Sequence, residues 1–373
     1  MRILFDHQAF TIQKYGGISR YYAELINAFK ENTEIDTRIS LVTSENENLN
    51  LIYPGRKLSL LPKQDFRGKT YASHLLNKAG STLALKRNEF DIFHPTYYDR
   101  YFLKSIKKKP FVLTVYDTIY EKLNHLYPEL QSDKQGVYDK RKILDAASAI
   151  IAISNHTKLD IIELYQLDPS KVVTIPLAMA NPETKHFEID NCFTFDLKKK
   201  YLLFVGNRTI YKNFDFFFRS VSSYLYDEKD LYLVCAGGSP FTDAEKQLFK
   251  NLGVISRVIH QPINDLSINS IYSGALAFVF PSLYEGFGIP VLEAMGNGCP
   301  CILSSGGSLP EVGAESAVYF NPVDSNSILN AVSSVVKDEQ LRKSLVKSGR
   351  KRVSEFSWKK TADMTFALYD SIL

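Results

Sequence analysis

The sequence predicts an α/β protein made of two Rossmann-like domains, each built on a parallel sheet. Short apolar, β-branched runs alternate with amphipathic stretches along the chain, which is typical of βαβ units. The length of 373 residues fits two domains of roughly 100–200 residues each. A break lies between Pro176 and Lys200, where two prolines and a run of three lysines show no period, and a new strand-loop-helix unit begins at Tyr201.

The first half contains six expected strands and one clear helix. Apolar residues recur on one face over Ile18–Phe29, which predicts an amphipathic helix. The expected strands are Arg2–Phe5, Arg38–Thr43, Ile92–His94, Phe111–Val115, Ala149–Ile153 and Val172–Ile175.

The second half repeats this alternation with six more strands. Helical periods cover Ile328–Val336 and Trp358–Leu373. Ligands of such sheets bind at the carboxyl ends of the strands. The expected strands are Tyr201–Gly206, Leu231–Ala236, Val258–His260, Ala277–Phe280, Pro300–Leu303 and Ala317–Phe320.

The composition is that of an ordinary globular protein, with 45% hydrophobic and 23% charged residues. No apolar run approaches the ~18–20 residues that span a bilayer, and the apolar start at Met1 is too short for a signal peptide. We therefore expect a cytoplasmic chain without a membrane span. The cysteines lack the spacing of a zinc site or a disulfide frame, which predicts small buried residues at Cys192, Cys235, Cys299 and Cys301.

The net charge of +4 is unevenly distributed. Residues 1–180 hold 25 Lys and Arg against 20 Asp and Glu, a balance of +5, and residues 181–373 hold 20 against 21, a balance of −1. Cations are mixed with apolar residues over 56–71 and again over 101–109, at Lys104 and Lys107–Lys109. This pattern suits peripheral contact with anionic lipid at the inner face of the cytoplasmic membrane; the alternative is a solvated basic face. The mild charge gives no argument for nucleic acid.

Two loops are candidates for binding an anion. Gly16 and Gly17 open the Ile18–Phe29 helix, where free N–H groups and the helix dipole favour negative charge, although a plain tight turn would have the same sequence. The loop after Gly206 presents Arg208 and Lys212, which suit a diphosphate unless they are ordinary surface charges.

The segment Phe280–Met295 is the most specific. A strand, a loop with glycines and a helix opened by Pro290 carry Glu285 and Glu293, whose carboxylates suit ligand hydroxyls. A dinucleotide fingerprint is disfavoured because Val291 stands where that motif needs glycine or alanine. A glycosidase is disfavoured because both carboxylates belong to one turn region.

Glu285-x7-Glu293, within Glu-Gly-Phe-Gly-Ile-Pro-Val-Leu-Glu-Ala-Met, resembles the signature of retaining GT-B glycosyltransferases of family 4. Supporting segments follow in the family's order: Gly16-Gly17, Thr114–Asp117, Ala152–Ser154, Gly206 to Asn213, Ala236–Gly238, Pro310–Val312 and Phe356–Trp358. The resemblance implies two facing Rossmann-like domains with a cleft between them. It places the acceptor on residues 1–177, with a final helix over about 357–373 crossing back, and the nucleotide sugar on 178–356.

The resemblance also implies roles for individual residues. Glu293 would bind ribose hydroxyls, Glu285 the hydroxyls of the donor sugar, and Lys212 with Arg208 the diphosphate and leaving group. Pro262 and Ile263 would meet the base. The remaining donor contacts are expected from the backbone of Gly16, Gly17, Gly206, Gly286, Phe287, Gly288 and Ile289.

Acceptor-side roles are expected at three residues. Asp117 would position the acceptor or accept its proton, although a helix-capping role is the alternative. Tyr116 stands where many relatives have histidine, and Asn207 intervenes where relatives often have arginine directly after the glycine. His94 ends an expected strand and would either touch the acceptor or be a hydrogen-bonded structural residue.

These expectations combine into one function: metal-independent, cofactor-free transfer of a hexose or N-acetylhexosamine, with retention, from a UDP- or GDP-sugar to a saccharide. Metal independence is expected because the chain has no Asp-x-Asp. From the family, the expected acceptor is a saccharide linked to polyprenyl diphosphate in the synthesis of O-antigen or another surface polysaccharide. The alternatives are a non-catalytic protein that binds sugar nucleotides and a sugar-nucleotide epimerase of the same fold.

Overall fold

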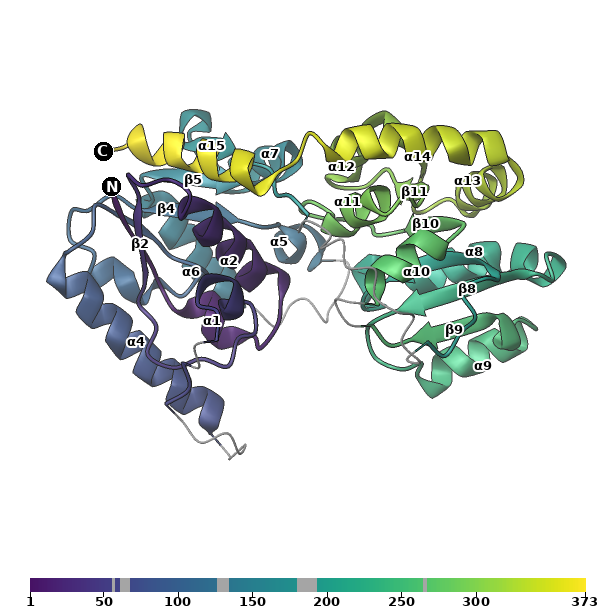
Figure 1. The fold of residues 1–373 in the computed structure, drawn as a ribbon, viewed down its shortest axis with the longest axis horizontal. Helices are drawn as coiled ribbons and strands as arrows, with labels where there is room; N and C mark the ends of the chain where they lie inside the picture. Colours follow the sequence, from purple (N-terminus) through teal and green to yellow (C-terminus); the bar gives the residue numbers. More distant parts are fainter. Residues whose placement is uncertain (56–57, 61–67, 126–133, 180–192, 264–266) are drawn as a thin grey trace. The chain divides into compact units, whose positions relative to one another are not determined.

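The chain forms two compact units in a computed structural model that describes residues 1–55, 58–60, 68–125, 134–179, 193–263 and 267–373. Unit 1 comprises Met1–Leu177 together with Ser357–Leu373, and unit 2 comprises Ala178–Phe356 (Figure 1). Each unit has its own set of parallel strands and its own hydrophobic core. The predicted α/β class, with a parallel sheet in each Rossmann-like half, is confirmed.

Unit 1 carries two three-stranded parallel sheets, β2-β1-β3 and β4-β5-β6. They meet where Phe93 forms a parallel bridge to Phe111, so the six strands follow one another as β2-β1-β3-β4-β5-β6. The elements are β1 (Arg2–Phe5), α1 (Gln8–Ile12), α2 (Gly17–Phe29), β2 (Asp36–Ile39), α3 (Leu49–Ile52), α4 (Lys69–Arg87), β3 (Ile92–His94), the 3-10 helix Arg100–Lys104, β4 (Val112–Val115), α5 (Ile119–Leu123), α6 (Lys134–Ala146), β5 (Ala149–Ala152), α7 (Asn155–Tyr165), the 3-10 helix Pro169–Lys171, β6 (Val172–Thr174) and α15 (Trp358–Asp370).

Helix α15 returns from the end of the chain to pack on α2 in unit 1 (Figure 1). It begins at Trp358 because the Ser357 hydroxyl accepts a hydrogen bond from a backbone N–H of its first turn. The Thr361 hydroxyl donates to the carbonyl of Pro176 (2.8 Å), and the buried Tyr369 lies 2.5 Å from the imidazole of His94. These contacts join the last helix to β3 and to the segment that follows β6.

Unit 2 carries one six-stranded parallel sheet in the order β12-β11-β10-β7-β8-β9. The order reverses between β7 and β10, and ligands of open parallel sheets bind beside such a reversal. The elements are β7 (Lys200–Val205), the 3-10 helix Ile210–Lys212, α8 (Phe214–Asp227), β8 (Leu231–Ala236), α9 (Asp243–Asn251), the 3-10 helix Ile255–Arg257, β9 (Val258–Gln261), α10 (Ile268–Gly274), β10 (Ala277–Phe280), α11 (Ile289–Gly296), β11 (Cys301–Ser304), α12 (Leu309–Gly313), the 3-10 helix Ala314–Ser316, β12 (Ala317–Phe320), α13 (Ser325–Lys337) and α14 (Glu339–Val353).

The second strand is where the sequence prediction was wrong. It was expected over Arg38–Thr43, and the structure has it over Asp36–Ile39. Pairing with β1 sets this register, since Arg2 lies opposite Asp36. Beyond the strand, the backbone N–H of Thr43 donates to the side chain of Asn77 instead of a neighbouring strand. The other expected strands agree with the structure within one residue at either end.

Cys235, Cys299 and Cys301 are buried and unpaired, as predicted; Cys192 lies outside the described residues. Burial raises the pKa of the Cys235 and Cys299 thiols, so both stay protonated. In the part of the chain that the structure describes, no helix combines the length and the apolar character needed to cross a bilayer.

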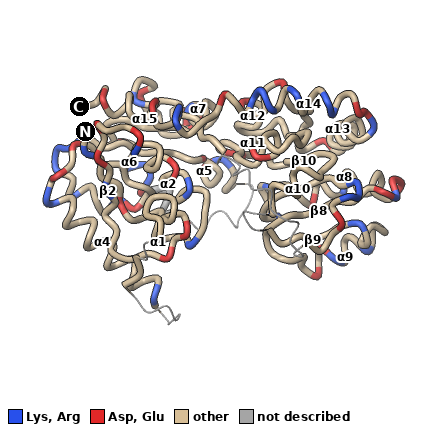
Figure 2. The backbone as a smooth tube through the Cα atoms, viewed as in Figure 1, with Lys and Arg blue, Asp and Glu red and all other residues tan. Residues whose placement is uncertain are grey.

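The two basic segments, 56–71 and 101–109, differ from the prediction in the burial of some of their side chains. Most cations of 56–71 lie outside the described residues, but Lys69 is buried and its ammonium pairs with Glu45 at 2.7 Å. In the second segment, Lys104, Lys107 and Lys108 are exposed, whereas Phe102 belongs to the core of unit 1. Figure 2 shows cations and anions interspersed along both units. The prediction of cations mixed with exposed apolar side chains is therefore wrong at Lys69 and Phe102.

Candidate active site

The centre of the candidate site in unit 2 is an ion pair between Lys212 and Glu285. Lys212 ends the short helix that follows β7, and Glu285 lies in the loop that follows the neighbouring strand β10. The two segments are joined by a backbone hydrogen bond from Leu283 to the Tyr211 carbonyl (2.8 Å), which brings the Lys212 Nζ to 2.6 Å from the Glu285 Oε1. Both side chains are largely buried, with 16% of Lys212 and 12% of Glu285 exposed, so the surrounding segments fix the pair in place.

The loop that follows β11 supports the backbone of Glu285. The fully buried Ser308 places its hydroxyl 3.0 Å from the Glu285 carbonyl and 2.9 Å from the Phe287 carbonyl. Gly307 has a positive φ of 59°, and a Cβ there would lie 2.6 Å from the Glu285 backbone nitrogen. Only glycine fits this approach. The sequence reasoning missed this support; the signal was the Gly306-Gly307-Ser308 run directly after an expected strand.

Glu293 lies on α11, whose start is set by Gly288 in a left-handed conformation (φ 100°) and by Pro290 in the first turn. The hydroxyl of Tyr272, on α10, donates to the Glu293 Oε2 at 3.1 Å. Burial raises the pKa of Tyr272 well above its ordinary value, so this hydroxyl remains a donor. One carboxylate oxygen is thereby fixed by Tyr272, a residue that the sequence reasoning did not single out.

Arg208 has a different environment from Lys212. Its guanidinium lies 2.6 Å from the Glu245 Oε1, donates to the Ser239 carbonyl at 2.8 Å, and packs on the Phe241 ring at 4.7 Å. Glu245 also closes the capping box at the start of α9. Arg208 thus ties the loops after β7 and β8 together, and its charge is compensated. Its role toward a diphosphate stays a prediction.

Gly206, Gly237 and Gly238 allow the loops after β7, β8 and β9 to lie close to one another. A Cβ on Gly238 would lie 2.8 Å from the Gly206 carbonyl oxygen, and a Cβ on Gly237 would lie 2.9 Å from the Ile263 side chain. All three glycines have positive φ angles. The predicted base-contacting residues Pro262 and Ile263 therefore lie beside the Gly237-Gly238 turn, while Gly206 packs against the turn's other glycine.

The remaining predicted donor contacts surround the start of α11. Phe287 is buried with its ring against Phe356, so its side chain belongs to the core and its backbone follows Gly286 and precedes Gly288 in the loop. Ile289 is the first residue of the helix. The structure thus gathers the predicted backbone contacts at a helix start beside Glu285. Their binding of a donor stays a prediction.

Gly16 and Gly17 belong to unit 1, where they begin α2. Gly16 is the N-cap residue and provides no side-chain hydrogen bond to the first helical turn. Its carbonyl accepts from the Ser19 hydroxyl at 3.0 Å and from the Asn48 amide at 3.3 Å, which fixes the loop. This arrangement is compatible with the predicted anion contact, because no side chain of the N-cap residue occupies the helix start.

Asp117 and Tyr116 follow β4 in unit 1. Asp117, which precedes the N-cap residue Thr118, accepts through Oδ1 from the Ile119 N–H at the start of α5 (3.1 Å), and its carbonyl accepts from Lys140 (2.8 Å). Tyr116 is buried, with its ring 5.9 Å from that of Tyr21. Burial raises the pKa of Tyr116 well above its ordinary value, so this phenol is neutral.

His94 is fully buried inside unit 1. Its ring nitrogens lie 2.5 Å from the Tyr369 hydroxyl and 2.9 Å from the Thr114 hydroxyl. Burial lowers the pKa of His94 to about 3, so the ring is neutral. These surroundings match the structural interpretation of His94, and an acceptor contact of this residue stays a prediction.

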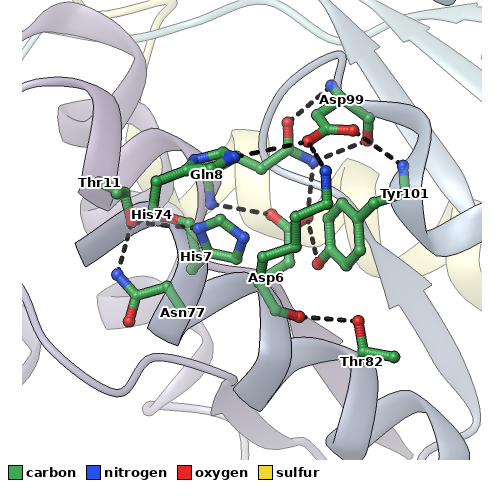
Figure 3. A network of polar contacts seen from close by, with 10 residues as sticks. Asp6, His7, Gln8, Thr11, His74, Asn77, Thr82, Asp99 and Tyr101 are labelled. Atoms are coloured by element: carbon green, nitrogen blue, oxygen red, sulfur yellow. Dashed lines mark hydrogen bonds and ion pairs between the residues drawn. The ribbon is translucent and has the colours of Figure 1, made fainter. Parts of the chain in front are cut away.

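A buried polar network around Asp6 holds the loops after β1 and β3 together (Figure 3). The Asp6 carboxylate accepts from the Thr96 N–H (2.8 Å) and hydroxyl (2.7 Å), from the Gln8 amide (2.7 Å) and from the Tyr101 hydroxyl (3.1 Å). Asp99 accepts from Lys78 at 2.8 Å beside it. The sequence reasoning overlooked this network, although an aspartate directly after an apolar strand was visible.

The two halves of the chain match two family models. Residues 186–352 match the family model of the glycosyl transferases group 1, and residues 15–179 match that of glycosyltransferase family 4. The two matches adjoin and together take in most of the chain. This protein belongs to glycosyltransferase family 4. The lysine–glutamate pair and the glutamate on α11 therefore lie in the half of this glycosyltransferase that matches the group 1 model.

Two curated relatives match over long stretches of the glycosyltransferase. It is 25% identical over 377 aligned residues to the O-antigen chain mannosyltransferase B of Escherichia coli, covering 95% of both chains. It is 27% identical over 303 residues to an uncharacterized glycosyltransferase of Methanocaldococcus jannaschii, covering 76% of this chain and 75% of the relative.

The solved structures show the fold of the glycosyltransferase. The Anabaena protein HepE, whose structure contains UDP and glucose, superposes with a TM-score of 0.73 at 15% identity, with full coverage of both chains. Structural similarity at this level assigns the GT-B fold.

Proposed function

We propose that this glycosyltransferase moves a hexose or N-acetylhexosamine from a UDP- or GDP-linked sugar to a saccharide acceptor with retention at the anomeric carbon. The observation that carries the proposal is the Lys212–Glu285 pair beside the start of α11. Lys212 and the helix N–H groups are complementary to the negative charge that grows on a departing nucleoside diphosphate.

Glu293 and Glu285 would bind different parts of the donor. Glu293, with one oxygen fixed by Tyr272, would accept hydrogen bonds from the ribose diol. Glu285 would accept hydrogen bonds from hydroxyls of the donor sugar, and donor binding would exchange part of its contact with Lys212 for contacts to the ligand. HepE, which has this fold, was solved with UDP, which supports a nucleotide-linked donor.

The acceptor is proposed as a saccharide linked to polyprenyl diphosphate in the synthesis of O-antigen or another surface polysaccharide. The E. coli relative, an O-antigen chain mannosyltransferase that aligns over nearly the whole chain, supports this acceptor class. The proposal assigns the acceptor to unit 1 and the donor to unit 2.

The decisive experiment measures hydrolysis of UDP- and GDP-sugars by the purified protein without an acceptor. We expect slow release of nucleoside diphosphate from one donor, and its loss in Glu285→Ala. Glu315→Ala, an exposed glutamate of unit 2, is the matched control and should keep the wild-type rate. Donor binding without turnover over a panel of acceptors would indicate a binding protein, and a free epimer as product would indicate an epimerase; either result overturns the proposal.

We further propose that the transfer needs no metal ion, because Lys212 and the α11 helix start supply positive charge at the proposed diphosphate position. Full activity in EDTA is expected. A loss of activity in EDTA that Mg²⁺ or Mn²⁺ restores would refute metal independence and leave the glycosyltransferase assignment intact.

Peripheral contact with anionic membrane is a separate proposal, now supported by fewer residues. Lys104, Lys107 and Lys108 are exposed, and Leu60 and Tyr71 are exposed apolar side chains at the other predicted segment. Each cation near an anionic surface contributes ~1 kcal/mol. We expect co-sedimentation with phosphatidylglycerol vesicles that disappears in high salt. No binding even at low salt would refute the proposal.

A further inference from the structure

The loop that carries Glu285 is in aromatic contact with the segment that ends α14. Phe287 follows Glu285 by two residues, and its buried ring lies edge-on to the ring of Phe356, with centroids 5.9 Å apart. Phe356 comes three residues after α14, and its backbone N–H donates to the Val353 carbonyl at 3.0 Å. An edge-to-face pair of rings is favourable beyond the area that it buries, so Phe356 restricts where Phe287 can lie.

Arg352, in the last turn of α14, joins this aromatic contact to the other support of the loop. Its guanidinium lies 4.8 Å from the centre of the Phe356 ring. The same guanidinium donates to two backbone carbonyls of α12, at 2.7 and 3.0 Å. The N-cap residue of α12 is Ser308, whose hydroxyl contacts the Glu285 loop. One side chain therefore fixes Phe356 and α12 together, and both of them hold the Glu285 loop.

Phe356 is also the last residue of unit 2, because the chain passes into unit 1 at Ser357. Trp358 begins α15, and its ring lies 6.1 Å from that of Tyr21, on α2 in unit 1. Phe356 thus fastens one side of this short segment to the Glu285 loop, and Trp358 fastens the other side to α2. Consecutive Cα atoms are about 3.8 Å apart, so a displacement of Phe356 is carried to Trp358 through a single residue.

We propose that Phe356 is a positioning residue for Glu285 and links the binding of the donor sugar to the junction between the two units. Donor binding would exchange part of the Lys212–Glu285 contact for contacts to the sugar, and the Glu285 loop adjusts to this exchange. The Phe287 ring moves with the loop, and the Phe356 ring follows it because the edge-to-face contact is retained. This inference rests on the proposed transferase function, to which it adds a positioning residue.

The experiment follows the fluorescence of Trp358, the single tryptophan of the chain, while the full chain is titrated with UDP-glucose, UDP-N-acetylglucosamine and GDP-mannose. Calorimetry in parallel identifies which nucleotide sugar binds. That nucleotide sugar should shift the emission in the wild type and in Phe356→Tyr, which keeps the ring. In Phe356→Leu the shift should disappear although the nucleotide sugar still binds. Phe216→Leu, at an exposed phenylalanine of α8, is the matched control and should keep the wild-type shift.

Donor hydrolysis without an acceptor provides the second readout. Phe356→Leu should raise the KM for the nucleotide sugar about three- to tenfold, the size of a lost aromatic contact, with little change in kcat. Phe287→Leu removes the other ring of the same contact. The double variant should therefore have the KM of either single variant, because the contact is already lost, and not the product of the two effects.

The two readouts separate this inference from the proposed function. An equal emission shift in Phe356→Leu, or none in the wild type when calorimetry shows binding, would overturn the link to the junction. An unchanged KM in Phe356→Leu, or multiplied effects in the double variant, would show that the ring only packs at the helix end and would overturn the positioning role. These results leave the proposed function standing. Binding of none of the nucleotide sugars by the wild type, together with no donor hydrolysis, would instead count against the proposed function.

Discussion

The support of the Glu285 loop by Ser308 predicts a measurable cost when its hydroxyl is removed. In Ser308→Ala, the backbone N–H of residue 308 still donates to the Glu285 carbonyl, since that bond (3.1 Å) does not involve the side chain. The Phe287 carbonyl loses its hydrogen bond from the fully buried Ser308 hydroxyl, which lies 2.9 Å away in the wild type. A buried acceptor that loses its donor costs about 1–3 kcal/mol.

A value near 2 kcal/mol would lower the melting temperature of unit 2 by about 4–8 °C, at ~2–4 °C per kcal/mol for a domain of this size. Because the same bond orders the loop that carries Glu285, part of this free energy should also appear as a higher donor KM, by about 30-fold at most. Calorimetry is the suitable assay, because Trp358, the single tryptophan of the chain, lies in unit 1.

Ser273→Ala is the matched control, since its exposed hydroxyl donates to a helix carbonyl at 3.2 Å. It should change the melting temperature of unit 2 by less than about 1 °C. If Ser308→Ala melts like the wild type and binds the donor equally well, the hydroxyl does not hold the loop and the reasoning is refuted.

Two further predictions concern Tyr272 and His94. Tyr272→Phe removes the hydroxyl that donates a hydrogen bond to Glu293. The KM for the nucleotide sugar should rise about three- to tenfold, the equivalent of ~1 kcal/mol, with little change in kcat. An unchanged KM in steady-state kinetics would show that Tyr272 does not position Glu293. Burial lowers the pKa of His94 to about 3, against about 6.5 in the unfolded chain, so below pH 6.5 the unfolded state binds more protons and the stability of unit 1 is lost progressively. From pH 7.5 to 5 the loss should be about 2 kcal/mol in urea unfolding followed by Trp358 fluorescence. His94→Asn should flatten this dependence, and an equally steep one in the variant would contradict the assignment.

Most strands, and the helices α2, α13 and α15, could be predicted because local patterns specify them, whereas the long helices α4, α8 and α14 were not predicted. Buried apolar runs such as Tyr201–Phe204 form strands, and the apolar face of Ile18–Phe29 forms a helix. The register of β2 could not be predicted, since pairing with β1 decides it. The sequence also identified Glu285, Glu293 and Lys212 as candidates, because unusual residue types follow the ends of strands.

Other parts of the candidate site depend on contacts between distant segments, which one sequence does not reveal. Arg208 was expected to hold a diphosphate together with Lys212, yet Glu245, brought close by the loop after β8, compensates its charge. Lys69 looked like a surface cation, yet Glu45 pairs with it in a buried position.

The sequence by itself determined the fold class and the identity of the residues at the carboxyl ends of the strands. It also determined the uneven distribution of charge, because residue order and composition are local properties. Only the tertiary structure decided which charges are paired, that Ser308 and Gly307 support the Glu285 loop, and that Tyr272 donates to Glu293. The physical reason is that burial and pairing arise between segments that the sheets bring together across long stretches of chain.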